Sequence, residues 1–158
     1  NYLDAFGERG EGRGEFNVVH SLATGPDGRI FVVDRDNRRI QVFNETTRAA
    51  AWYHPNVAPV AVWPDFGLPL DIIVNGYDVW VTDLSPPKIV KLDLNGNVQY
   101  TWLLETEGPN RYIEMHSFAV DSDNNLYGSD NQMGRTQKFV PKADGDTALL
   151  VGQPYVAP

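Results

Sequence analysis

Two histidines are the residues of this chain best suited to chemistry. His20 and His116 hold the same place in two repeated segments, at the start of a strand. Neutral imidazole binds metals of the zinc class well, so two converging rings would supply part of a zinc site. A catalytic zinc usually takes three protein ligands, so a third would have to come from elsewhere. The alternative is that both rings only hydrogen-bond to nearby backbone groups.

The elements that must position these histidines are β-strands. Residues 20–43 contain an apolar run, a Pro-Asp-Gly turn, a run rich in β-branched residues that ends at Asp34, and a third run that ends at Phe43. The pattern returns twice, with Asp83 and Asp130 spaced 49 and 47 residues along the chain. This period, with no helical pattern, predicts an all-β fold: a β-propeller with about three four-stranded blades.

The whole chain, 1–158, is expected to form one partial propeller domain. Its expected parts are a leading strand and glycine-rich linker (1–16), blade 1 and its connector (17–68), blade 2 and its connector (69–115), and blade 3 (116–158). The fourth strand of blade 1 is expected at 49–54, before a connector over 55–68. Blade 3 is expected to end with a fourth strand at 147–152.

Antiparallel blades place the start of the first strand and the end of the second at one face. Several polar residues are therefore expected at one mouth of the central channel, where ligand sites tend to lie: His20, His116, Asp34, Asp130 and Arg35. Blade 2 has Leu70 at the histidine position. A base follows each repeated aspartate by five residues (Arg39, Lys88 and Arg135), which predicts a structural, charge-assisted link at the corner of each blade.

Three other candidates have simpler explanations. Asp121, Asp123 and Asn125 resemble the opening of a calcium loop, but Leu126 stands at the glycine position and Gln132 at the closing glutamate, so an ordinary turn is expected. Three tryptophans suit either a sugar platform or packing between blades, and packing is favoured: Trp63, Trp80 and Trp102. His54 is expected to have a surface or packing role.

Composition excludes several classes of partner. A formal net charge of -8 disfavours nucleic acid and anionic membrane surfaces. The chain has no cysteine, which excludes disulfides and thiolate metal sites. No apolar segment approaches the roughly 20 residues that span a bilayer.

Three blades cannot close a ring, since propellers use about four to eight. Two arrangements would complete the fold: a homodimer that makes a six-bladed ring, or three further blades on a longer chain. Open blade faces rich in Val, Ile, Trp and Phe would otherwise be wet.

The segment VVHSLATGPDGRIFVVDRDNRRIQVF is similar to the repeats of NHL-type six-bladed propellers. More narrowly, the order of a histidine blade, a blade without histidine, and MHSFAVDSDNNLYGSDNQMGRTQKF resembles the later half of peptidyl-α-hydroxyglycine α-amidating lyase and its bacterial relatives. The resemblance implies that His20 and His116 are zinc ligands and that Arg35 binds a substrate carboxylate. It implies a secreted or periplasmic location.

The same resemblance leaves parts of the lyase site unmatched. The third histidine and the tyrosine base of that family have no counterpart here, and Ser117 stands at a calcium-binding aspartate, which puts calcium in doubt. Two hypotheses follow. The chain is a lyase-like half-propeller that is incomplete as a single chain, or it is a non-catalytic scaffold that binds a peptide, protein or small ligand at the channel face.

Overall fold

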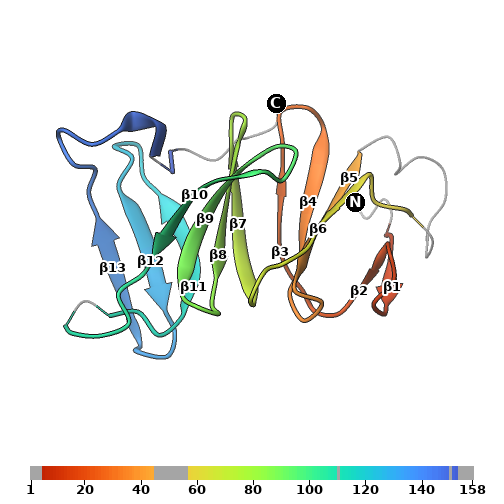
Figure 1. The fold of residues 1–158 in the computed structure, drawn as a ribbon, viewed down its shortest axis with the longest axis horizontal. Helices are drawn as coiled ribbons and strands as arrows, with labels where there is room; N and C mark the ends of the chain where they lie inside the picture. The colour runs from red at the N-terminus through yellow and green to blue at the C-terminus, as the bar shows by residue number, and fades with distance from the viewer. Residues whose placement is uncertain (1–4, 45–56, 110, 150, 153–158) are drawn as a thin grey trace.

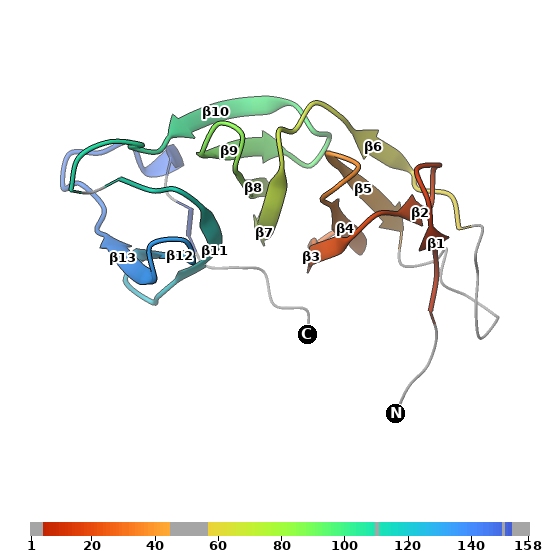
Figure 2. The ribbon, with the colours of Figure 1, turned by 90° about the horizontal axis from the view of Figure 1, so that it is seen from below.

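The computed structural model describes residues 5–44, 57–109, 111–149 and 151–152. Three antiparallel sheets stand side by side, and a small two-stranded sheet flanks the first (Figure 1). In Figure 2 the sheets fan out along an arc, with the first strand of each on the concave side. These are the blades of a partial β-propeller, as the repeat predicts. Among the described residues, no helix is long and apolar enough to cross a membrane.

Blade 1 has four strands in the order β3-β4-β5-β6. The first three are β3 (Val19–Thr24), β4 (Arg29–Asp34) and β5 (Arg39–Asn44), as predicted. The fourth, β6 (Ala61–Trp63), lies in the stretch 55–68 that was expected to be a connector, so the expectation of a connector without a strand is wrong. Trp63 explains the placement, because its side chain is buried in the core while β6 pairs with β5. The strand expected at 49–54, with His54, falls outside the described residues.

Blade 2 follows the prediction closely. Its strands are β7 (Pro69–Asn75), β8 (Asp78–Asp83), β9 (Lys88–Asp93) and β10 (Val98–Leu103). The Asn-Gly hairpin between β7 and β8 has Gly76 at φ 56°, a left-handed conformation that glycine adopts without strain. Local turn chemistry therefore specifies this blade well.

Blade 3 differs from the prediction at its end. Its described sheet has three strands: β11 (Met115–Val120), β12 (Leu126–Asp130) and β13 (Arg135–Phe139). Where the fourth strand was expected, residues Thr147–Leu149 form a short 3-10 helix. Blade 2 holds this segment, because Lys91 Nζ donates to the carbonyl of Ala148 at 2.6 Å and Asn75 Nδ2 donates to that of Val151 at 3.0 Å.

The glycine-rich stretch before blade 1 is more than a linker. β1 (Glu8–Arg9) and β2 (Glu15–Phe16) pair in parallel, and the loop between them packs on blade 1. The Arg39 guanidinium fastens it by donating to the carbonyls of Glu11, Gly12 and Glu15. The spacing of residues in the sequence does not reveal that Arg39 binds these carbonyls. The loop was therefore predicted only as a linker.

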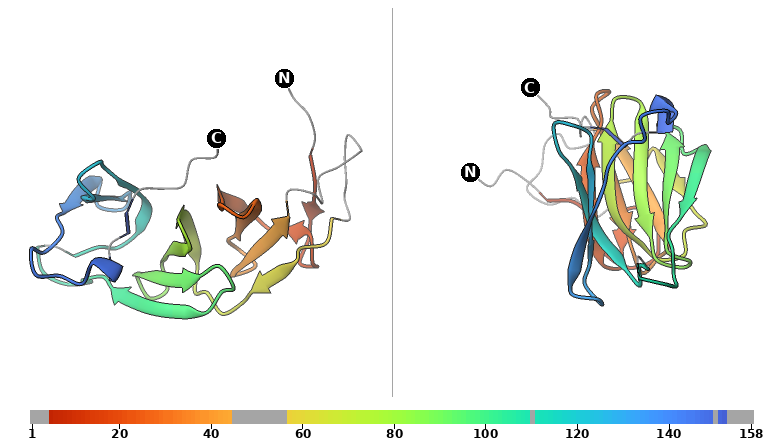
Figure 3. Two further views of the ribbon diagram at one scale, coloured as in Figure 1. Left: turned by 90° about the horizontal axis from the view of Figure 1, so that it is seen from above. Right: turned by 90° about the vertical axis from the view of Figure 1, so that its left-hand side faces the viewer.

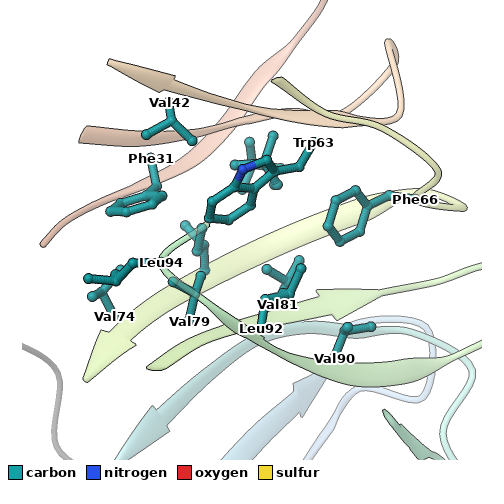
Figure 4. Close-up of a cluster of buried hydrophobic side chains, with 13 residues drawn as sticks. Phe31, Val42, Trp63, Phe66, Val74, Val79, Val81, Val90, Leu92 and Leu94 are labelled. Carbon is teal, nitrogen blue, oxygen red and sulfur yellow. The ribbon is translucent and has the colours of Figure 1, made fainter. Parts of the chain in front are cut away.

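The core lies between blades. One buried cluster joins blades 1 and 2 and contains Phe31, Val42 and Trp63 from blade 1 and Val79 and Leu92 from blade 2 (Figure 4). A second joins blades 2 and 3. It contains Trp80, and Trp102 packs against it. Packing between blades, rather than a sugar platform, thus accounts for all three tryptophans, as predicted.

The outward faces of the two end blades differ in character. On blade 1, Phe6 and Phe16 cover the apolar side chains Val32 and Phe43. On blade 3, the face that points away from blade 2 carries mainly polar residues: Ser117, Ala119, Tyr127, Ser129, Thr136 and Lys138. The expectation of apolar open faces therefore fails for blade 3.

The repeated aspartates fasten the segment that leads into each blade. Asp34 and Asp130 accept the backbone N–H groups of Asn17 and Ile113, and Asp83 accepts those of Gly67 and Leu68. All three carboxyl side chains are buried. A buried carboxylate needs such partners, because its desolvation is otherwise costly.

The predicted ion pairs of the corner are confirmed in two blades. Arg39 and Lys88 contact their aspartates at 2.7 and 3.2 Å. In blade 3 the Arg135 guanidinium instead donates to the carbonyls of Pro109 and Arg111. The corner is structural in each case.

We expect Asp34→Ala to destabilise the protein by about 3 kcal/mol, since it leaves the Arg39 guanidinium and the Asn17 N–H without their buried acceptor. Urea denaturation followed by circular dichroism measures the loss. Asp36→Ala is the matched control, because it removes only a partly exposed ion pair with Arg35 and should change stability by less than about 1 kcal/mol. Equal losses in the two variants would contradict a structural role for the repeated aspartate.

Candidate functional site

The two candidate histidines meet on the concave side of the sheets. Their ring centroids are 4.9 Å apart, with the rings inclined at 70°. His20 lies on β3 and His116 on β11, the first strands of blades 1 and 3, which flank β7 in Figure 2. The expectation that these histidines approach one place is confirmed.

An irregularity in the strand pairing occurs at each histidine. The register shifts between Val19 and Ser21 in β3 and between Met115 and Ser117 in β11. In β7 it shifts between Pro69 and Ile72, a stretch that includes Leu70. A bulge releases a side chain from strict alternation and turns it in a new direction, and bulges are common beside active sites. The repeat thus gives each blade a bulge at this position, and blades 1 and 3 fill it with imidazole.

Hydrogen bonds indicate the tautomer of both rings. His20 Nδ1 lies 2.6 Å from the carbonyl oxygen of Leu70, and His116 Nδ1 lies 2.7 Å from Glu114 Oε1. Both oxygens only accept, so each of these contacts takes a proton on Nδ1, and in the neutral ring Nε2 then keeps its lone pair. This is the arrangement in which a second group orients a metal-binding or proton-accepting histidine. Asn131 Nδ2 lies 3.3 Å from His116 Nδ1, a longer contact than the one to Glu114.

Glu114 was not among the residues that the sequence singled out. Burial raises the pKa of Glu114, but hydrogen bonds from His116 and Gln132 outweigh it and hold the pKa below its ordinary value of 4.5. The carboxylate is therefore ionised at neutral pH and can stabilise a positive charge on His116. The spacing Glu-x-His at the start of β11 was the available signal.

Asp71 was also missed, and it joins the three inner strands. On β7, its Oδ1 accepts from Ser21 Oγ of β3 at 2.6 Å, and its Oδ2 accepts from Phe118 N of β11 at 3.1 Å. One carboxylate thus bridges the blades that carry the histidines. A charged residue within the apolar run Leu-Asp-Ile-Ile-Val was the signal that could have revealed it.

Arg35 lies at the corner after β4, at the same end of blade 1 as His20. Its Nε donates to Asp36 Oδ1 at 2.8 Å, and its backbone N–H donates to the carbonyl of Val18. Val18 has a φ of 62°, which is strained for a β-branched residue. The structure does not place Arg35 in contact with either histidine.

The ligands for a metal are incomplete in this part of the chain. Among the described residues, no three His, Asp or Glu side chains lie close enough together to hold a metal ion. The two imidazoles fit zinc in kind and in tautomer, but they provide only two donors.

The calcium-like segment forms a turn. Asp121 accepts the N–H groups of Asp123 and Asn125 and the hydroxyl of Tyr127. Hydrogen bonds from Asn125 are the largest cause that lowers the pKa of Asp121, to about 2. Ser117 Oγ lies 3.0 Å from Ser129 Oγ, across to β12.

Comparison with known proteins defines the class of the fold. The NHL repeat family matches residues 16–43, which contain β3, β4 and all but the last residue of β5. Over 41 residues, 26% of this chain, the sequence is 49% identical to the human NHL repeat-containing protein 3 and 46% identical to the mouse protein. The match spans 12% of those relatives' length.

Two solved structures resemble the fold at low sequence identity. One is a catalytically inactive virginiamycin B lyase from Staphylococcus aureus with quinupristin (TM-score 0.51, 19% identity, 80% of this chain and 42% of that one). The other is luciferin-regenerating enzyme (TM-score 0.53, 15% identity, 87% and 43%). Both chains are more than twice as long as the part matched here. The chain is therefore a partial β-propeller, and residues 16–43 of its first blade match the NHL repeat family.

We expect Asp71→Ala to loosen the contact between the two histidines, because it removes the acceptor shared by β3 and β11. The free energy of unfolding should fall by about 2 kcal/mol, the cost of leaving buried donors unpaired. Imidazole proton shifts of His20 and His116, measured by NMR, should both move. Asp123→Ala, in an exposed turn of blade 3, is the control and should leave both rings unchanged.

The pKa of Glu114 gives a second test. A lowered folded-state pKa stabilises the protein above the unfolded pKa, and this contribution is lost as pH falls through the folded value. A carboxyl carbon NMR titration should therefore give a midpoint below 4.5 for Glu114. His116→Ala should raise that midpoint, whereas His20→Ala, which keeps the Glu114 contact, should not. If His116→Ala left the Glu114 midpoint unchanged, the pairing of Glu114 with His116 would be overturned.

Proposed function

We propose that this chain carries part of the active site of a zinc-assisted lyase of the peptidyl-α-hydroxyglycine amidating type, which releases glyoxylate. The observation that supports the proposal is the histidine pair on matching bulges, with both Nδ1 atoms held by acceptors. The proposed zinc ligands are His20 and His116. Remaining ligands would come from a second copy of the chain, as in a six-bladed homodimer, or from further blades.

The proposal gives each residue of the candidate site a specific role. A zinc ion held by the imidazoles would act as a Lewis acid on the substrate hydroxyl. The Leu70 carbonyl and the Glu114 carboxylate fix the two rings and keep Nε2 available as a ligand. The Arg35 Nε is used by Asp36, so its terminal nitrogens are the groups proposed to bind the substrate carboxylate.

Metal analysis tests this proposal before activity does. Protein treated with a chelator, reloaded with zinc and desalted should retain metal, and His20→Ala and His116→Ala should each lose it. His54→Ala, at the chain's remaining histidine, is the control and should bind as the parent does. A zinc content of the parent protein no higher than that of the two histidine variants would refute the metal site. Glyoxylate release from an α-hydroxyglycine peptide then tests the reaction itself.

A scaffold function is the second candidate. The observation that favours it is the lack of a three-ligand cluster in the described part of the chain. In that case the histidines serve packing, and the channel face binds a peptide, protein or small ligand without chemistry. Retained zinc that depends on both histidines would reject this candidate in favour of the first.

A further inference from the structure

Blade 2 departs from blades 1 and 3 at one corner on the outer side of the propeller. In blade 1, Arg39 and Gln41 both donate to the carbonyl of Glu15, in the segment that leads into the blade. In blade 3, Arg135 and Gln137 stand at the same positions, and Arg135 donates to the carbonyl of Arg111. Both blades therefore carry an Arg-x-Gln pair at this corner, and in each the arginine holds the backbone of the preceding segment.

Blade 2 has Lys88 and Val90 in place of this pair. Val90 offers no donor, and the lysine ammonium contacts Asp83 at 3.2 Å. The residue that matches Glu15 and Arg111 is Asp65, whose backbone takes a left-handed φ of 71°. The segment leading into blade 2 thus follows a different path at the point where the other blades supply a carbonyl.

A cavity of about 460 Å³ lies at this corner. Its lining combines the charged residues Lys88, Asp83 and Asp65 with the apolar side chains Trp63, Phe66, Val90 and Leu92, which are labelled in Figure 4. In Figure 3 the outer strands β6 and β10 follow one another along the convex side of the arc, and Val98 of β10, which lines the cavity, is 63% exposed.

We propose that this groove between blades 1 and 2 binds an extended peptide segment through a main-chain carbonyl and one apolar side chain. The other two blades indicate the occupant, because chain carbonyls fill the matching place there. A lysine ammonium has three donors, so Lys88 can bond to a peptide carbonyl while it keeps Asp83. Since Asp83 already balances its charge, the site favours a neutral carbonyl over a carboxylate. The apolar lining favours a residue such as Leu or Phe.

The groove is separate from the histidine pair, which lies on the inner strands β3 and β11. Lys88 and Val90 belong to β9 and Thr101 to β10, the two outer strands of blade 2. Peptide binding here needs neither metal nor Arg35. The proposal therefore stands or falls independently of the lyase function.

The probes are acetylated and amidated eight-residue Ala/Ser peptides with a central Leu, Phe or Asp, titrated into ¹⁵N-labelled full-length protein. We expect the Leu and Phe peptides to shift the amide signals of Val90 and Thr101 and the indole signal of Trp63, and the Asp peptide to leave them in place. Thr101→Arg, a change at an exposed position that lines the groove, should weaken binding about tenfold, or about 1.4 kcal/mol. Tyr100→Arg, on the opposite face of the same strand, is the matched control and should bind as the parent does.

A second variant converts the corner to the form found in the other blades. Lys88→Arg with Val90→Gln should draw the 64–66 segment into the groove and abolish the peptide shifts. The proposal is overturned if no peptide shifts groove signals at millimolar concentration, or if Thr101→Arg and Tyr100→Arg behave alike. It is equally overturned if the same shifts arise on raising protein concentration without peptide, because a second copy would then be the occupant.

Discussion

A buried carboxylate at the end of the second strand sets the geometry of every blade. Asp34, Asp83 and Asp130 cannot remain buried without donors, and the nearest donors are backbone N–H groups of the segment that enters the blade. Meeting this requirement fixes where the first strand begins. It also fixes the bulge one or two residues later, and therefore the direction of His20 and His116. The position of the candidate site follows from a structural aspartate that takes no part in its chemistry.

Asp71 extends the same principle from one blade to three. Packing between blades is largely apolar, and apolar contacts resist separation but define the offset between sheets only loosely. A carboxylate that accepts from Ser21 and Phe118 defines that offset, because hydrogen bonds lengthened by an ångström are lost. The 4.9 Å separation of the histidine rings thus depends on a residue from a blade that has no histidine.

The sequence predicted what repeats and missed what occurs once. Strand positions in blade 2 followed from alternation and from two Asn-Gly turns, which act over a few residues. β6 was predicted as part of a connector, because Trp63 is held by packing against strands that are distant in the sequence. The glycine-rich loop was missed because Arg39 reaches it across more than 20 residues of sequence. Asp71 was overlooked for the same reason, since its partners Ser21 and Phe118 lie on the adjoining blades. Glu114 was missed although its partner His116 is only two residues away.

Comparison among the three copies also shows where one blade lacks a structural contact that the other two make. A residue that is present in all copies of the repeat serves the fold. Where one copy lacks such a residue, another local contact must replace it, or a cavity remains. In blade 2 the Arg-x-Gln pair is lost while the Asp83 anchor remains, so the corner keeps its shape but not its internal carbonyl partners. Blade 2 forms the same bulge with Leu70, so the fold does not require imidazole at this position. The histidines of blades 1 and 3 are therefore an addition to the bulge. The histidine pair and the groove lie at opposite edges of the sheets, the histidines on the inner strands and the groove on the outer strands. Each site can therefore change without disturbing the other.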